Sequence, residues 1–135
     1  LDFGPALRQL VTSMSGASQN PPELDIVNPV LSFITPKLGE QLLNIAREAL
    51  SNSTRHAQAS HRWIRLSLVE NAVQLIIGDN GVGFSTVRKR RAGHGLGNMA
   101  TRAKQISAIF TLKSAPGEGT RVIVDIPLKK EHIYE

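Results

Sequence analysis

The sequence contains no cysteine among its 135 residues, which excludes disulfide bonds and thiolate metal sites and leaves the redox compartment open. Phe, Trp and Tyr together make up only 4% of the chain, too few for the platforms on which single-stranded nucleic acids stack. No apolar run approaches the roughly 20 residues that a membrane-spanning helix needs. None of the 4 histidines has a partner at metal-ligand spacing, which argues against a zinc site.

The chain begins at Leu1, without an initiating methionine and without a basic segment followed by an apolar one. We therefore expect no signal peptide, and we expect the chain to be a piece of a longer protein. Its length suits one domain with a real core. The net charge of +5 fits either a nucleic-acid binder or a site for a polyphosphate. The densest cluster of cations, residues 88–91, lies between two glycine clusters.

The hydrophobic pattern predicts alternating helices and hairpins. Thr35-Pro36 marks the start of a long helix, because Thr is a good N-cap and Pro is tolerated in the first turn. Glu70-Asn71 and residues 115–119 are expected to turn two hairpins. Helices and antiparallel hairpins alternate in blocks along the chain. This order favours a two-layer α+β fold over a doubly wound parallel sheet. The predicted helices are 3–14, 36–56 and 96–106, and the predicted strands are 23–27, 61–69, 72–77, 109–113 and 120–126. In the last helix one face is expected to carry Leu96, Met99, Ala100, Ala103 and Ile106.

One face of the long predicted helix carries Asn44, Glu48 and Asn52, and Arg55 and His56 continue this stripe one turn later. The opposite face is small or apolar and suits packing on a sheet. Two amides and one carboxylate suit oxygen ligation and proton handling. An Asn amide oxygen can complete the shell of Mg²⁺ beside phosphate oxygens and water. A solvated polar face explains the same spacing, so spacing alone leaves both interpretations open.

Asp79 ends an apolar strand and opens the loop Asp-Asn-Gly-Val-Gly. An ionised Asp only accepts hydrogen bonds, so it can accept one from the exocyclic amine of adenine, whereas the carbonyl oxygen of guanine would face it unfavourably. Gly81 and Gly83 allow close approach of the backbone to a flat ring and allow positive φ. A simple turn is the alternative, because Asp-Asn-Gly is also common turn chemistry.

A second glycine cluster, Gly93, Gly95 and Gly97, comes just before a predicted helix. Free amides at a helix start form an anion site, and glycines let phosphates come near. The cations at 88–91 either add attraction for a triphosphate or form a solvated loop, and His94 is placed to hydrogen-bond a ligand. The cluster is neither a P-loop nor a dinucleotide fingerprint, since the required residues and spacing are missing.

The order of these motifs along the chain resembles that in the catalytic domain of sensor histidine kinases. Residues 47–57 look like the N box of that family, 79–84 like its first glycine box, 93–99 like its second and 117–120 like its terminal Gly-Thr box. Together the boxes cover roughly residues 36–128 in the family's order. The Arg-His-Ala ending of the N box and the short lid resemble the subfamily that regulates nitrate, redox or lipid responses.

The resemblance implies a Bergerat fold, a two-layer α/β sandwich with three helices on one face of a mixed, mostly antiparallel sheet. ATP would bind between the layers, with Asp79 on the adenine amine and Thr120 nearby. Asn52 would hold Mg²⁺, and Glu48 would be the polarising or general-base residue for the phosphoacceptor histidine. The other residues that the resemblance assigns to the ATP site and its lid are Asn44, Arg55, His56, Gly81, Gly83, Gly93, His94, Gly95, Leu96, Gly97 and Met99.

The sequence departs from the family in one respect. It has no His-Asp or His-Glu pair to accept the phosphoryl group, and we expect no helical hairpin within residues 1–22. The resemblance therefore implies transfer of the ATP γ-phosphoryl to a histidine on a separate dimerisation domain, with a response regulator downstream. We expect a monomeric isolated domain, a homodimeric full-length kinase, a cytoplasmic location and no nucleic-acid partner.

We divide the chain into an N-terminal helix and linker (1–22), an ATP-binding domain (23–128) and a charged tail (129–135). The first region is a candidate remnant of the dimerisation region. Two other functions stay open. One is a serine kinase of the same fold that acts on an anti-sigma-factor antagonist, against which Asn98-Met99 and the Arg-His-Ala ending speak. The other is a non-catalytic nucleotide- or nucleic-acid-binding module, against which the presence of Glu48, Asn52 and Asp79 speaks.

Overall fold

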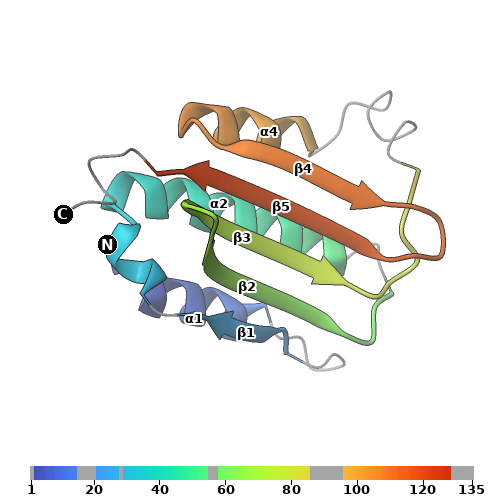
Figure 1. Ribbon diagram of the computed structural model, residues 1–135. Coiled ribbons are helices and arrows are strands. Elements are labelled where there is room, and N and C mark those ends of the chain that lie inside the picture. Colours follow the sequence, from blue (N-terminus) through green and yellow to red (C-terminus); the bar gives the residue numbers. More distant parts are fainter. Residues whose placement is uncertain (1, 15–20, 28, 55–57, 86–95, 129–135) are drawn as a thin grey trace.

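The computed structural model describes residues 2–14, 21–27, 29–54, 58–85 and 96–128, and of Leu96 it describes the backbone only. Helices lie on one face of a sheet (Figure 1). The helices are α1 (Phe3–Ser13), α2 (Pro36–Asn52) and α4 (Leu96–Gln105), with a 3-10 turn η1 (Val30–Phe33) before α2. The strands are β1 (Glu23–Ile26), β2 (Arg62–Val69), β3 (Ala72–Asp79), β4 (Ile109–Ser114) and β5 (Thr120–Pro127).

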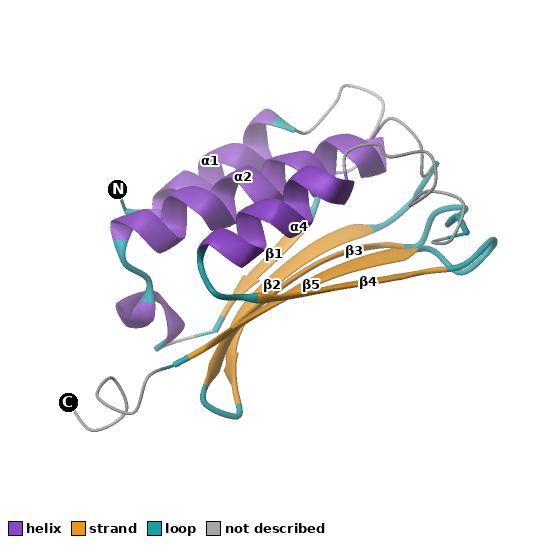
Figure 2. Cartoon of the chain, turned by 90° about the horizontal axis from the view of Figure 1, so that it is seen from above, coloured by secondary structure: helices purple, strands orange, loops and turns teal. Residues whose placement is uncertain are grey.

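The sheet has 5 strands in the order β1-β2-β3-β5-β4. β1 runs parallel to β2, while the pairs β2–β3, β3–β5 and β4–β5 are antiparallel. Seen nearly along the sheet, α1, α2 and α4 all lie on the same side of it (Figure 2). This confirms the predicted two-layer α+β fold with a mixed, mostly antiparallel sheet. In the described part of the chain, no helix is long and apolar enough to cross a membrane.

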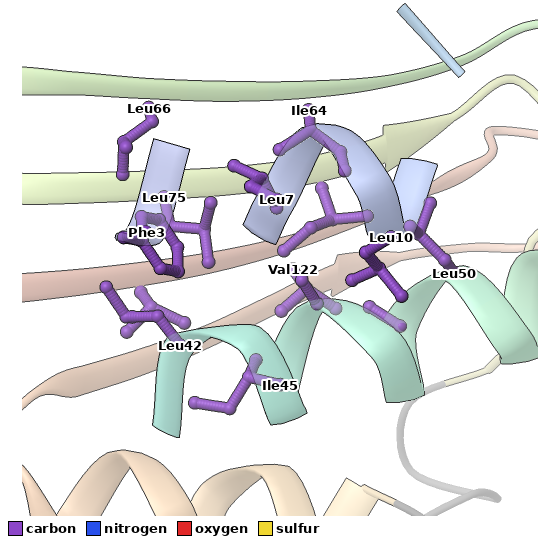
Figure 3. Close-up of a cluster of buried hydrophobic side chains, with 14 of the residues drawn as sticks. Phe3, Leu7, Leu10, Leu42, Ile45, Leu50, Ile64, Leu66, Leu75 and Val122 are labelled. Carbon is purple, nitrogen blue, oxygen red and sulfur yellow. The ribbon is translucent and has the colours of Figure 1, made fainter. Parts of the chain in front are cut away.

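The core lies between the two layers and forms because alternate strand residues point at the helices. Leu42 of α2 lies close to Leu75 of β3 there, and both are fully buried, as is Ile45 of α2 (Figure 3). α1 packs into the same core through Leu7, which is also fully buried. The face of α2 predicted to pack on the sheet is therefore confirmed. On α4, Met99 and Ala103 are buried as predicted, but Ala100, expected on the same face, is exposed.

Local sequence explains where the elements begin and turn. Thr35 caps α2 by accepting a hydrogen bond from the Leu38 backbone N–H at 3.2 Å, and Pro36 follows at the first helical position. The α-helix ends at Asn52 and continues as a π-helical turn at residues 53–54, and the predicted end near residue 56 lies outside the described residues. Glu70 and Asn71 both adopt positive φ, 48° and 63°, which matches the twist of a two-residue hairpin between β2 and β3.

The turn between β4 and β5 packs against the loop that follows β3. The Gly117 backbone N–H donates to the Val82 carbonyl at 2.6 Å. Gly119 has a φ of 74°, and a side chain there would collide with the Asp79 carbonyl oxygen. Gly83 has a φ of 65°, and a side chain there would collide with the Ala115 carbonyl oxygen. Glycine is therefore required at positions 83 and 119 both for conformation and for space.

We predict that Gly119→Ala destabilises the domain more than Gly117→Ala. Gly117 also has positive φ, 82°, but a methyl group there would meet nothing within 4 Å. Each substitution should cost about 1–2 kcal/mol for the left-handed conformation. Gly119→Ala should cost a further ~1–3 kcal/mol because the strands at Asp79 must shift. Urea unfolding of both variants measures the difference, and equal losses would show that the close approach at position 119 is unimportant.

Candidate functional site

The carboxylate of Asp79 lies at the end of β3, on the side of the sheet that faces the helices. It follows Val73, Leu75 and Ile77 in the alternation of that strand, and only 6% of the residue is exposed. In the sheet register it lies between Arg62 of β2 and Thr120 of β5. Its Oδ1 accepts a hydrogen bond from the Gly81 backbone N–H at 2.8 Å. A buried acceptor is thus held by a central strand and by the turn that follows it.

The turn after β3 has a structural role as well. The Asn80 side-chain oxygen accepts hydrogen bonds from the backbone N–H groups of Ser60 and His61 at 3.0 and 2.9 Å. Its side-chain nitrogen donates to the Ser60 hydroxyl at 2.9 Å. The turn chemistry considered as an alternative is therefore present, and it fixes the loop while Asp79 faces the other layer. Gly81 is not among the glycines with positive φ, so that part of the prediction holds for Gly83 alone.

Ser114, at the end of β4, joins the first glycine box to the terminal Gly-Thr box. Its hydroxyl oxygen accepts from the Phe84 backbone N–H at 3.0 Å and lies 2.9 Å from the Thr120 hydroxyl. The same hydroxyl donates to the Gly119 carbonyl at 2.9 Å. Sequence reasoning missed Ser114, because a lone serine at a strand end carries no distinctive signal. Thr120, predicted beside Asp79, is half-buried and directly opposite it in the register.

A hollow of ≈ 850 Å³ opens beside this end of the sheet. Asp79 and Thr120 lie on its wall, together with Ser114 and the β4–β5 turn. The described residues of α2 do not line it. Its wall includes Trp63, Lys113 and Arg121, which lie in register with Gly78 on the face of the sheet away from the helices, so the hollow is not the predicted cleft between the layers. The lining residues are Trp63, Asp79, Asn80, Leu112, Lys113, Ser114, Ala115, Glu118, Thr120 and Arg121.

The polar stripe of α2 borders the core without entering it. Asn44, Glu48 and Asn52 are all half-buried, in contrast to the buried face on the other side of the helix. The Asn44 side-chain oxygen already accepts a hydrogen bond from Arg47 at 2.9 Å. Figure 1 shows that α2 runs along the sheet and that its C-terminal end lies at the end of β3. Asn52 and Asp79 therefore end their elements on the same side of the molecule.

Arg62 is a second site residue that the sequence analysis did not single out. It opens β2 directly opposite Asp79, and only 4% of it is exposed. Its Nη1 donates to the Thr54 hydroxyl at 2.8 Å, just beyond the end of α2. Burial lowers the pKa of the Arg62 guanidinium, and attraction to Asp79 acts in the opposite direction. The sequence did carry a signal for Arg62, because the other residues on its face of β2 are apolar.

Of the second glycine cluster, only Gly97 lies within the described residues. Gly97 is exposed in the first turn of α4, and a side chain there would meet nothing within 4 Å. Met99 is fully buried in the core. Leu96 begins α4, and its side chain lies outside the described part. The remaining predicted site residues outside the described part are Arg55, His56, Gly93, His94 and Gly95.

Comparison with known proteins agrees with this geometry. The solved structure of the Acinetobacter baumannii histidine kinase AdeS superposes with a TM-score of 0.75 at 17% identity, covering 96% of this chain and 66% of that chain. The ATP-binding domain of PrrB from Mycobacterium tuberculosis superposes with a TM-score of 0.68 at 19% identity, covering 96% of both chains. At these identities the likeness shows the fold alone.

The sequence comparisons go further. The sensor protein VraS of Staphylococcus aureus (strain COL) is 34% identical over 134 residues, which are 98% of this chain and 38% of VraS. The chain therefore spans well under half the length of this relative. Residues 38–130 match the family model of histidine kinase-, DNA gyrase B- and HSP90-like ATPases. The predicted resemblance is confirmed: the chain belongs to the histidine kinase-, DNA gyrase B- and HSP90-like ATPase family.

Proposed function

We propose that this chain is the ATP-binding catalytic domain of a sensor histidine kinase. The observation that carries the proposal is the buried Asp79 carboxylate, which faces the helical layer at the end where α2 finishes. The adenine amine would donate to this carboxylate, with the Thr120 hydroxyl beside it. Guanine would present a carbonyl oxygen instead, so the site should favour ATP over GTP.

Mg²⁺ fits this site only as part of a metal–nucleotide complex. Among the described residues, no group of three or more His, Cys, Asp or Glu side chains could hold a metal ion. The half-buried Asn52 amide at the end of α2 would supply one oxygen ligand, with the nucleotide phosphates and water supplying others. The bound ion would neutralise charge on the phosphates. Asn44, one turn earlier, would support Asn52, and Arg55 or His56 would contact phosphate.

The glycine-rich segments would complete the ATP site. Gly81 and Gly83 would line the purine pocket, where the structure holds their loop against the β4–β5 turn. Gly93, His94, Gly95, Leu96 and Gly97 would form the lid and the anion site ahead of α4, and Met99 would support that helix from the core. These assignments rest on the family's order of motifs.

Phosphoryl transfer needs a histidine that this chain does not supply in the family's motif. A ring nitrogen of that histidine would attack the ATP γ-phosphorus, and the bond to the ADP oxygen would break. Glu48, half-buried on the same stripe as Asn52, would accept the proton from the attacking imidazole or polarise it. The phosphoacceptor would lie on a dimerisation domain of the same kinase, from which a response regulator takes the phosphoryl group.

The proposed function also gives an oligomeric state to the domain and a role to each region of the chain. The domain would be a monomer by itself and part of a homodimer in the full-length kinase, working in the cytoplasm where ATP is available, without a nucleic-acid partner. Residues 23–128 would form the ATP-binding domain proper, and 129–135 a charged tail. Residues 1–22 would connect it to the dimerisation region, although α1 shares the domain's core through Phe3 and Leu7.

We predict that Asp79→Asn weakens ATP binding by about 1.5–3 kcal/mol, the usual contribution of a hydrogen bond to a charged group. Isothermal titration calorimetry of the chain with ATP measures it, and the wild-type chain titrated with GTP should show weaker binding. Asp25→Asn is the matched control, because Asp25 is an exposed strand carboxylate bonded to Arg65 at 2.8 Å on the opposite face of the sheet. Equal ATP affinities of wild type and Asp79→Asn would refute the proposed role of Asp79.

A second prediction concerns the chemical step. Glu48→Gln should keep ATP affinity and slow phosphoryl transfer in trans to a dimerisation-domain fragment by about 10²–10⁴-fold, as expected for loss of a general base. Glu40→Gln is the control, because Glu40 is an exposed carboxylate on the same helix. Transfer is measured with radiolabelled ATP, and an acid-labile product identifies phosphohistidine. Unchanged transfer in Glu48→Gln would remove this residue from the mechanism.

A further inference from the structure

Arg62 is a buried cation directly opposite Asp79 in the sheet. Arginine is almost never fully buried unless it is paired, because removing its charge from water is costly. The next residues on the same face of β2, Ile64 and Leu66, are apolar and belong to the core. A methionine or leucine would fill this position at lower cost if packing were the only requirement.

The contacts of Arg62 join two elements of the site. Its Nη1 donates to the Thr54 hydroxyl, 2.8 Å away, immediately beyond the last turn of α2. In the antiparallel register it lies directly opposite Asp79, and both residues are more than nine-tenths buried. Directly opposite residues have Cβ atoms about 4.5–5.5 Å apart. At this separation, attraction to Asp79 raises the pKa of the Arg62 guanidinium against the effect of its burial. A guanidinium has several donors in a fixed fork and can serve two partners at once.

The Asp79 carboxylate needs such a partner. Its Oδ1 accepts a hydrogen bond from the Gly81 backbone N–H, but that amide carries no net charge. A buried carboxylate without a countercharge is strongly destabilising. Arg62 provides a positive charge from the neighbouring strand, inside the protein. The carboxylate can then be held in one orientation before any nucleotide arrives.

We propose that Arg62 is a positioning residue that orients the Asp79 carboxylate for purine recognition and couples it to the end of α2 through Thr54. The inference rests on the proposed function, since it assigns Arg62 a role in the same site. In this role Arg62 affects nucleotide binding only through the Asp79 carboxylate, which accepts the hydrogen bond from the purine amine. Loss of Arg62 should therefore impair recognition of the adenine amino group more than recognition of the rest of the nucleotide.

The test compares two nucleotides on Arg62→Met and Arg62→Lys. ATP carries the amine, while purine riboside 5′-triphosphate lacks it and is otherwise the same. Arg62→Met should weaken ATP binding by about tenfold, equivalent to ~1.4 kcal/mol, and change binding of the analogue by less than about twofold. Arg62→Lys keeps the charge and should recover part of the ATP affinity. An equal loss for both nucleotides, no loss, or tighter ATP binding in Arg62→Met would overturn the proposal.

Arg65→Met is the matched control, because Arg65 lies on the same strand and forms an ion pair with Asp25 that is exposed on the other face. It should leave both nucleotide affinities unchanged. Thermal melting of each variant without nucleotide reports folding, and Arg62→Lys keeps the test decisive if Arg62→Met does not fold.

The double variant Arg62→Met/Asp79→Asn separates this inference from the proposed function. If Arg62 acts through Asp79, adding Arg62→Met to Asp79→Asn should weaken ATP binding by less than about twofold more. Additive effects would show that Arg62 acts independently of Asp79 and would overturn the inference alone. If Asp79→Asn by itself leaves ATP affinity unchanged, the proposed function fails with it.

Discussion

The burial of one carboxylate is the constraint on which the site depends. Asp79 ends a central strand at 6% exposure, with Arg62 on one side and Thr120 on the other. A buried acceptor without partners is costly, so its surroundings are specified closely. One oxygen accepts a hydrogen bond from the Gly81 amide, and the carboxylate attracts the Arg62 guanidinium on the next strand. The remaining hydrogen-bonding capacity of this group is what an incoming purine amine would use.

The glycines around Asp79 serve the architecture as much as a ligand. Gly83 and Gly119 have positive φ, and each lies against the backbone of the other loop. Ser114 then ties Phe84, Gly119 and Thr120 together with its single hydroxyl. Two sequence motifs separated by more than thirty residues are therefore one packed unit at the end of the sheet. This packing explains why a glycine-rich loop without a P-loop pattern has a defined shape.

The fold was largely predictable from the sequence because its local signals agree with one another. The Thr35-Pro36 start of α2, the Glu70-Asn71 hairpin, the alternation of β2 and the apolar run of β3 all follow from local rules. One prediction failed because helical spacing alone does not fix which residues of a helix reach the core. Ala100 was expected on the same face of α4 as Met99, but it is exposed.

By itself, the sequence determined the elements, the two-layer class and Asp79 as a candidate acceptor, because periodicity and turn chemistry are properties of neighbouring residues. Helical spacing also gave the polar stripe of α2, and the resemblance to the family added Thr120 and the roles of the stripe residues. Only the tertiary structure decided the strand order, which brings Arg62 and Thr120 to either side of Asp79. It also decided that Ser114 joins two motifs. Those choices depend on contacts between distant segments, which pack to bury a common core and leave no local trace in the sequence.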